Sequence, residues 1–70
     1  MISIYHFIAA RDLVKGDVIR RHGHQRVLDT TPTPLPGEQR LLLIYRTPDL
    51  GGRYGDVALY PDDQVELVSR

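Results

Sequence analysis

Short apolar runs separated by turn residues cover most of this 70-residue chain. Valine, isoleucine, leucine, threonine and tyrosine are plentiful in these runs, whereas alanine and glutamate are scarce, which favours strands. The run at residues 39–46 is apolar on both faces, as expected of a strand in the middle of a barrel. The six predicted strands cover residues 4–8, 17–22, 25–30, 39–46, 53–59 and 65–68. The pattern therefore predicts an all-β chain of five to six short antiparallel strands.

Turn residues lie between these runs. A tight turn at residues 15–17 follows the apolar anchor Leu13, and its glycine permits a positive φ. Residues 31–37 contain three prolines, which remove hydrogen-bond donors, so this segment cannot be a central strand. Its Thr–Pro alternation suggests a polyproline ligand, but a stiffened hairpin connection is the favoured interpretation. Residues 48–52 predict another turn, and Pro61 with two following acids predicts one helical turn before the last strand.

The second and third predicted strands are close enough to form a hairpin, with two possible registers. A three-residue loop pairs Ile19 with Val27, but it also sets Arg20 against Arg26, which costs up to about 1 kcal/mol. A two-residue loop pairs Val18 with Val27 instead and sets Ile19 against Arg26. We favour the three-residue loop because it matches two apolar pairs.

Alternation also predicts which side chains are buried. The predicted core consists of Leu13, Ile19, Val27, Leu41, Leu43, Val57, Leu59, Val65 and Leu67. In the run at residues 4–8 both sides are apolar, so alternation does not select the buried one. We expect one domain over residues 1–70 whose stability is marginal, because a chain of this size buries only about 60% of its unfolded surface.

The two ends of the chain carry the pattern of a known fold. The opening D-L-x-x-G-D-x-I is formed by Asp12, Leu13, Gly16, Asp17 and Ile19. It is similar to the opening of several bacterial SH3-like barrels, including the first domain of elongation factor P. Residues 60–68 resemble the helical turn and final strand of SH3-like folds. The resemblance implies an SH3-like small β-barrel. It implies no function, because the chain has no tryptophan for a polyproline groove and no lysine-tipped loop.

The amino-acid composition narrows the class of protein further. There is no cysteine, hence no disulfide and no thiolate metal site, which fits a reducing compartment. We expect a cytoplasmic protein, because no stretch approaches the roughly 20 apolar residues of a membrane span. Residues 1–10 lack the basic region of a signal peptide and alternate like a strand.

The net charge is zero, but the charges are unevenly distributed. Residues 1–46 carry seven basic and four acidic side chains, whereas residues 47–70 carry two basic and five acidic ones. Arginine outnumbers lysine eight to one. Its planar guanidinium suits phosphate and carboxylate, although a GC-rich genome would give the same bias.

Catalytic and metal-binding patterns are weak. His22 and His24, with His6, could bind a metal ion, but a polar hairpin tip explains them better. The glycines of residues 51–55 lack the strand–loop–helix context of a phosphate-binding loop. The paired aspartates of the chain are explained by turns and a helix start, and no base accompanies the serines. We therefore expect no enzyme activity, no cofactor and no metal.

Residues 20–26 form a basic hairpin tip and give the best functional signal. The predicted binding surface consists of Arg20, Arg21, His22, His24, Arg26, Arg40 and Arg46. With four tyrosines able to stack on bases, this surface could bind nucleic acid, although the neutral net charge argues against it. The uneven charge instead suits a protein-interaction module or accessory subunit, whose partner is another protein or a second copy. We predict a non-catalytic binding module of this second kind, with nucleic-acid binding as the alternative.

Overall fold

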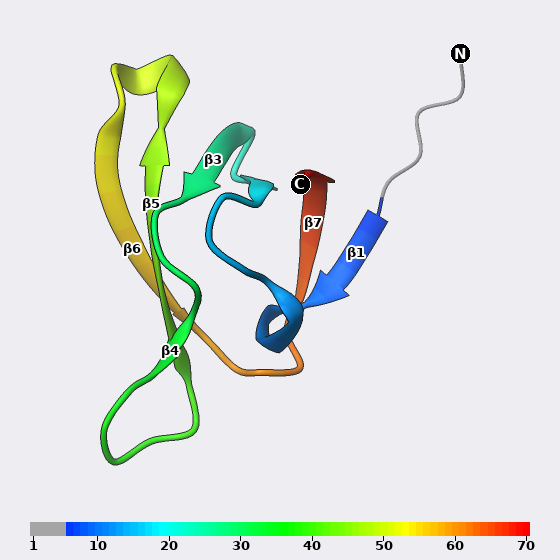
Figure 1. Ribbon diagram of the computed structural model, residues 1–70, viewed down its shortest axis with the longest axis vertical. Helices are drawn as coiled ribbons and strands as arrows, with labels where there is room; N and C mark the ends of the chain where they lie inside the picture. The colour runs from blue at the N-terminus through cyan, green and yellow to red at the C-terminus, as the bar shows by residue number, and fades with distance from the viewer. Residues whose placement is uncertain (1–5) are drawn as a thin grey trace.

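A computed structural model describes residues 6–70 and shows an all-β fold (Figure 1). The strands are β1 (His6–Ala9), β2 (Val18–Arg21), β3 (His24–Leu28), β4 (Thr33–Pro34), β5 (Leu41–Thr47), β6 (Arg53–Leu59) and β7 (Gln64–Ser69). Two 3-10 turns, η1 (Ala10–Asp12) and η2 (Pro48–Leu50), lie between them. The prediction of an all-β, antiparallel chain is confirmed. The first two residues of the strand predicted at 4–8 lie outside the described residues.

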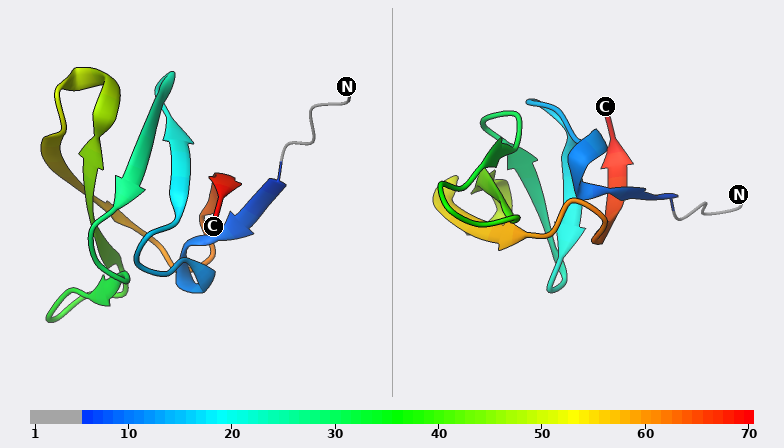
Figure 2. Two further views of the ribbon diagram at one scale, coloured as in Figure 1. Left: turned by 45° about the horizontal axis from the view of Figure 1, so that its top comes forward. Right: turned by 90° about the horizontal axis from the view of Figure 1, so that it is seen from below.

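The strands form one curled antiparallel sheet in the order β1-β7-β2-β3-β5-β4, with β6 on β5. The long strand β5 pairs with β6 over seven residues and is shared on its other side by β3 and β4 at opposite ends. Seen from below, the sheet curls into a half-barrel (Figure 2). This central position explains why β5 is the most continuous apolar run in the sequence.

The β2–β3 hairpin has the register that the sequence analysis did not favour. Val18 pairs with Val27 and Ile19 with Arg26, so the loop has two residues and the predicted three-residue loop is wrong. His22 (φ 52°) and Gly23 (φ 78°) are both left-handed, as a tight type I′ hairpin turn requires. This register places Gln25, rather than a second arginine, opposite Arg20.

The core lies on the inner face of the curl. Ala9 is buried but lies outside the core cluster. The cluster consists of Ala10, Leu13, Ile19, Leu28, Leu43, Leu59 and Val65, and Ile8, Leu41, Tyr45, Val57 and Leu67 pack against it. Eight of the nine predicted core residues are among these. The exception is Val27, which is half-buried on the outer face while Leu28 takes the core position. The register error caused this exchange, because a shift of one residue moves a side chain to the other face.

The opening turn joins η1 to the core and to β3. Gly16 has a φ of 92° and donates its N–H to the carbonyl of Leu28. Leu28 in turn donates its N–H to the carbonyl of Asp17. The Asp17 carboxylate is only 1% exposed and accepts the Val14 N–H at 2.9 Å. The predicted turn and its apolar anchor are therefore confirmed.

Two other connections differ from a simple loop. The proline-rich segment contributes the two-residue strand β4, which sits at the end of the strand order, where proline is tolerated. Before β7, the Asp63 N–H binds the Tyr60 carbonyl at 3.0 Å and the Asp63 carboxylate accepts the Tyr60 N–H. The expected helical turn is thus a β-turn with Pro61 in its second position. Over residues 6–70, no helical segment is long and apolar enough to cross a bilayer.

Candidate binding site

The tip of the β2–β3 hairpin lies beside the β5–β6 turn, at one end of the molecule (Figure 1). His24 Nδ1 and Asp49 Oδ2 are 2.9 Å apart and join the two turns. This hydrogen bond lowers the pKa of the Asp49 carboxyl below its ordinary value, and the charges of His24 and Arg26 act in the same direction. An acid from the second half of the chain therefore neutralises part of the basic tip.

Arg26 is held inside this end of the half-barrel. Its guanidinium carbon lies 4.6 Å from the centre of the Tyr45 ring, and Nη1 donates to Thr47 Oγ1 at 3.0 Å. The Tyr45 ring lies against Gly55 so closely that a Cβ there would come within 2.8 Å of it. The three residues form a stack, defined here as the Arg26–Tyr45–Gly55 stack. Such a stack holds the Arg26 guanidinium in place and covers one of its faces, so that the guanidinium is less available to a ligand.

Three other arginines of the predicted surface have acidic partners. Arg20 on the outer face of β2 binds Glu66 at 2.5 Å, and Arg46 lies 3.7 Å from Asp29. Arg40 pairs with Glu38, and the pKa of that carboxyl is lowered chiefly by their hydrogen bond. Of these three pairs, only Arg20–Glu66 joins the basic residues 1–46 to the acidic residues 47–70.

The structure brings together only part of the predicted binding surface. Arg21 and His22 lie at the hairpin tip, and within residues 6–70 neither has an acidic side chain in salt-bridge range. Arg40 directly precedes β5, at the end of that strand far from the hairpin tip, and Arg46 is paired with the outward-facing Val27. His6 is on β1, two strands away in the sheet order. No three His, Asp or Glu side chains of the described chain meet in a metal-binding group.

A second surface, which the sequence analysis did not identify, lies along β1. Among residues 6–70 the only strand paired with β1 is β7, so its other side is a sheet edge. The strand His6–Ala9 has no Asp, Glu, Lys or Arg, and neither proline nor glycine. Phe7 is 56% exposed on it. We call His6–Ala9 with its unpaired side the β1 edge.

The backbone alternation shows which groups the β1 edge leaves free. Ala10 donates its N–H to the Asp63 carbonyl at 2.9 Å, in the same register that pairs Ile8 with Val65. Antiparallel strands alternate between residues that bond to the neighbour and residues that point away. Phe7 and Ala9 therefore direct their N–H and C=O groups away from β7. Only Phe7 is exposed, because Ala9 is 7% exposed and is the N-cap residue of η1.

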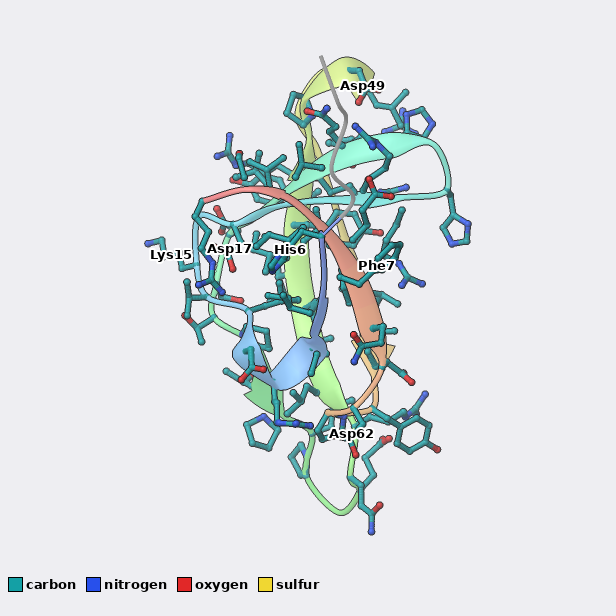
Figure 3. All side chains as sticks on the ribbon, turned by 90° about the vertical axis from the view of Figure 1, so that its right-hand side faces the viewer. His6, Phe7, Lys15, Asp17, Asp49 and Asp62 are labelled. Carbon is teal, nitrogen blue, oxygen red and sulfur yellow. The ribbon has the colours of Figure 1, made fainter. Side chains whose placement is uncertain are left out.

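Open hollows flank the β1 edge on both faces of the sheet. The outer one is lined by Phe7, Arg20, Arg21, His22, Gln64 and Glu66, among others. The inner one is lined by His6, Ile8, Asp12, Leu67, Val68 and Arg70, among others. Figure 3 shows His6 and Phe7 on opposite sides of the strand, as the alternation requires. The only hint in the sequence was the lack of any charge, proline or glycine in this run.

A scan of protein-family models, a search of curated proteins and a search of solved structures found no match to this chain.

Proposed function

We propose that this chain is a non-catalytic protein-interaction module that binds an extended segment of a partner protein along the β1 edge. One observation carries the proposal: β1 is an apolar edge strand with the exposed Phe7 directing its backbone groups outward and a hollow on each face. Protein sheets usually protect such an edge with charge, proline or a bulge. An edge without that protection is suited to pairing with another chain.

Strand addition would use both features of this surface. The outward N–H and C=O of Phe7 would supply hydrogen bonds that give affinity, independent of the partner's sequence. Alternate side chains of the added strand would meet the inner and the outer face, which gives specificity. The inner face offers Ile8 and Leu67, both half-buried, so we expect an apolar residue there.

The alternative of nucleic-acid binding has less support. Arg20 and Arg46 have acidic partners, and Arg26 is stacked and hydrogen-bonded inside the half-barrel. These contacts leave few cations to neutralise phosphates, and the net charge is zero. Retention on a polyanion column that is lost in an Arg20/Arg21/Arg26 triple alanine variant would support this alternative instead.

The proposal includes the fold class. The curled antiparallel half-barrel is compatible with a small barrel, and the opening turn buries Leu13 and Asp17 as the resemblance implies. On these grounds we assign the chain to the SH3-like small barrels. Such barrels serve many unrelated functions, so the assignment does not itself favour one partner over another.

A Phe7→Lys variant tests the proposal with little effect on the fold. Phe7 is 56% exposed, so we expect the stability to change by less than about 0.5 kcal/mol. The change places on the edge the kind of charge with which sheets usually protect themselves against strand addition. Binding at the β1 edge should be lost.

The measurement is a paired capture experiment from a lysate of the native host. Wild-type protein and Phe7→Lys are immobilised at equal density, and each captured protein is quantified by mass spectrometry. Proteins held by the wild type and lost by Phe7→Lys support strand addition. Tyr54→Lys, the same change at an exposed aromatic on β6, is the control that should keep them. Equal capture by wild type and Phe7→Lys would refute the proposed site.

A further inference from the structure

We infer that the outer face of β5 and β6 packs against the same face of a second copy, which gives a weak two-fold dimer. This face is separate from the β1 edge, because β5 and β6 lie on the opposite side of the molecule (Figure 1). Two apolar and two oppositely charged side chains form a pattern on it that is complementary to itself. We call the outer face of these two strands the β5–β6 face.

Alternation along the two strands identifies the side chains of the β5–β6 face. Leu43 and Leu59 belong to the core, and Tyr45 and Val57 pack against it, so the residues between them point outward. The outward side chains are Leu42, Ile44, Arg46, Tyr54, Asp56 and Ala58. The core thus accounts for only one of the two apolar faces of β5, and an interface accounts for the other.

The charged and aromatic side chains of the β5–β6 face are accessible. Tyr54 is 63% exposed, and the exposed Asp56 has no basic side chain in salt-bridge range within residues 6–70. The Arg46 side chain is 45% exposed, and its 3.7 Å contact with Asp29 is longer than a hydrogen bond. Arg46 and Asp56 can therefore each accept a partner of opposite charge.

The register of the β5–β6 hairpin arranges these side chains as a rectangle. Arg46 pairs with Tyr54, and Ile44 pairs with Asp56, so the two charges lie on one diagonal and the two apolar side chains on the other. A two-fold axis along the Ile44–Tyr54 diagonal, between two stacked faces, sets Arg46 of each copy against Asp56 of the other. Ile44 and Tyr54 then lie near the axis and meet their own counterparts. The strands of the two copies cross steeply, as in orthogonal sheet packing.

This arrangement selects a second copy and limits the strength of the dimer. Two arginine–carboxylate pairs form at once, and only a partner with the same rectangle of side chains supplies both. The apolar contacts of Ile44 and Tyr54 are few, and ion pairs at a wet rim contribute little. An interface of two short strands also buries less than the roughly 1,200–2,000 Å² of stable complexes. The dimer should therefore form only at high protein concentration.

Sedimentation equilibrium of the whole chain tests the dimer from about 1 µM to about 1 mM. The expected mass rises with concentration from 8.0 kDa toward twice that value. Tyr54→Lys should raise the dimer dissociation constant by about tenfold or more, because identical charges meet at the axis. Phe7→Lys, the same change at an exposed aromatic on β1, should associate as the wild type does. A monomeric wild type at about 1 mM, or unchanged association of Tyr54→Lys, would overturn the inference.

A mixing experiment assigns the contact between Arg46 and Asp56. Arg46→Glu and Asp56→Lys should each be monomeric alone, because each then sets like charges against each other at both contacts. Fluorescently labelled Arg46→Glu should bind Asp56→Lys, since both contacts of that mixed dimer join opposite charges. Asp62→Lys has the same net charge as Asp56→Lys but lies outside the β5–β6 face, so it should not bind the labelled variant.

Circular dichroism checks that every variant in the mixing experiment folds. Equal binding of the labelled Arg46→Glu to Asp56→Lys and Asp62→Lys, or no binding to either, would overturn the inference. None of these results affects the capture experiment on the β1 edge, because that experiment changes Phe7 and its control keeps the β1 edge intact.

Discussion

The β2–β3 hairpin tip has many charged side chains in the sequence, but the fold leaves few of them free. The β1 edge is the reverse, because it has no charged side chain but is open to a partner. The tip contains most of the cationic residues of the predicted surface, yet Arg20, His24 and Arg26 all have partners within the molecule. The β1 edge has no charged residue, yet its backbone groups and Phe7 face the open side. The comparison teaches that a cluster of arginines in a small neutral chain can stabilise the fold itself. Mutations at the tip should therefore change stability, and mutations at the edge should change association.

The largest effect at the tip is expected from Gly55→Ala. The added Cβ would meet the Tyr45 ring at 2.8 Å, so the ring must move and the Arg26–Tyr45–Gly55 stack is disrupted. Overpacking of this kind costs about 1–3 kcal/mol, a large share of the stability of a small domain. Urea unfolding measures the loss.

A double mutant serves as the control for Gly55→Ala. In a Tyr45→Leu background the ring is absent, so the added methyl group should cost less than it does in the wild type. Equal costs in both backgrounds would show that the two residues are not coupled. In variants that remain folded, capture of partner proteins at the β1 edge should be unchanged, since neither residue lies on β1.

Replacing single arginines sharpens the comparison within the tip. Arg26→Ala removes the stack on Tyr45 and the hydrogen bond to Thr47, and we expect a loss of about 1–2 kcal/mol. Arg21→Ala should change stability by less than about 0.5 kcal/mol, because Arg21 has no acidic partner within residues 6–70. Thermal unfolding of both variants measures the difference. A larger loss for Arg21→Ala would reverse the roles given to these two side chains.

The strand pattern was predictable because burial and alternation act locally. Leu43 and Val65 were placed in the core from spacing alone, and the turn at Gly16 from its need for a positive φ. The hairpin register was not settled by the same signals, because both loop lengths bury some apolar residues. Two factors decide the register. His22 adopts a left-handed φ beside Gly23, and the shorter loop keeps Arg20 from facing Arg26 across the hairpin.

The binding surface was harder to predict because it depends on contacts between distant segments. Nothing near His24 in the sequence indicates that Asp49 will lie beside it, 25 residues away. Likewise, the Gly55 position reads as a weak point in a strand until the Tyr45 ring is seen to fill it. An edge strand is defined by the strands it does not pair with, which spacing along the chain cannot reveal.

The smallest expected effect concerns the acid that joins the two turns at the tip. The Asp49 pKa lies below its ordinary value of 3.8, mainly because its carboxylate is hydrogen-bonded to His24. A carboxyl whose pKa is lower in the folded state binds protons more readily when unfolded. Its contribution to stability is therefore present above about pH 4 and is lost as the pH falls through the lower folded value. The contribution is small because exposed ion pairs contribute little.

Thermal unfolding of wild-type protein and Asp49→Asn between about pH 7 and pH 3 measures this contribution as the difference between their midpoints. The comparison with Asp49→Asn is needed because Glu38 also has a lowered pKa and loses its contact with Arg40 at low pH in both proteins. The difference should be positive near neutral pH and shrink toward zero under acid. Partner binding at the β1 edge should not follow this curve, since no carboxylate lies on β1. If partner binding weakened in parallel with the midpoint difference, the hairpin tip and the β1 edge would be coupled, and the separation of their roles would be wrong.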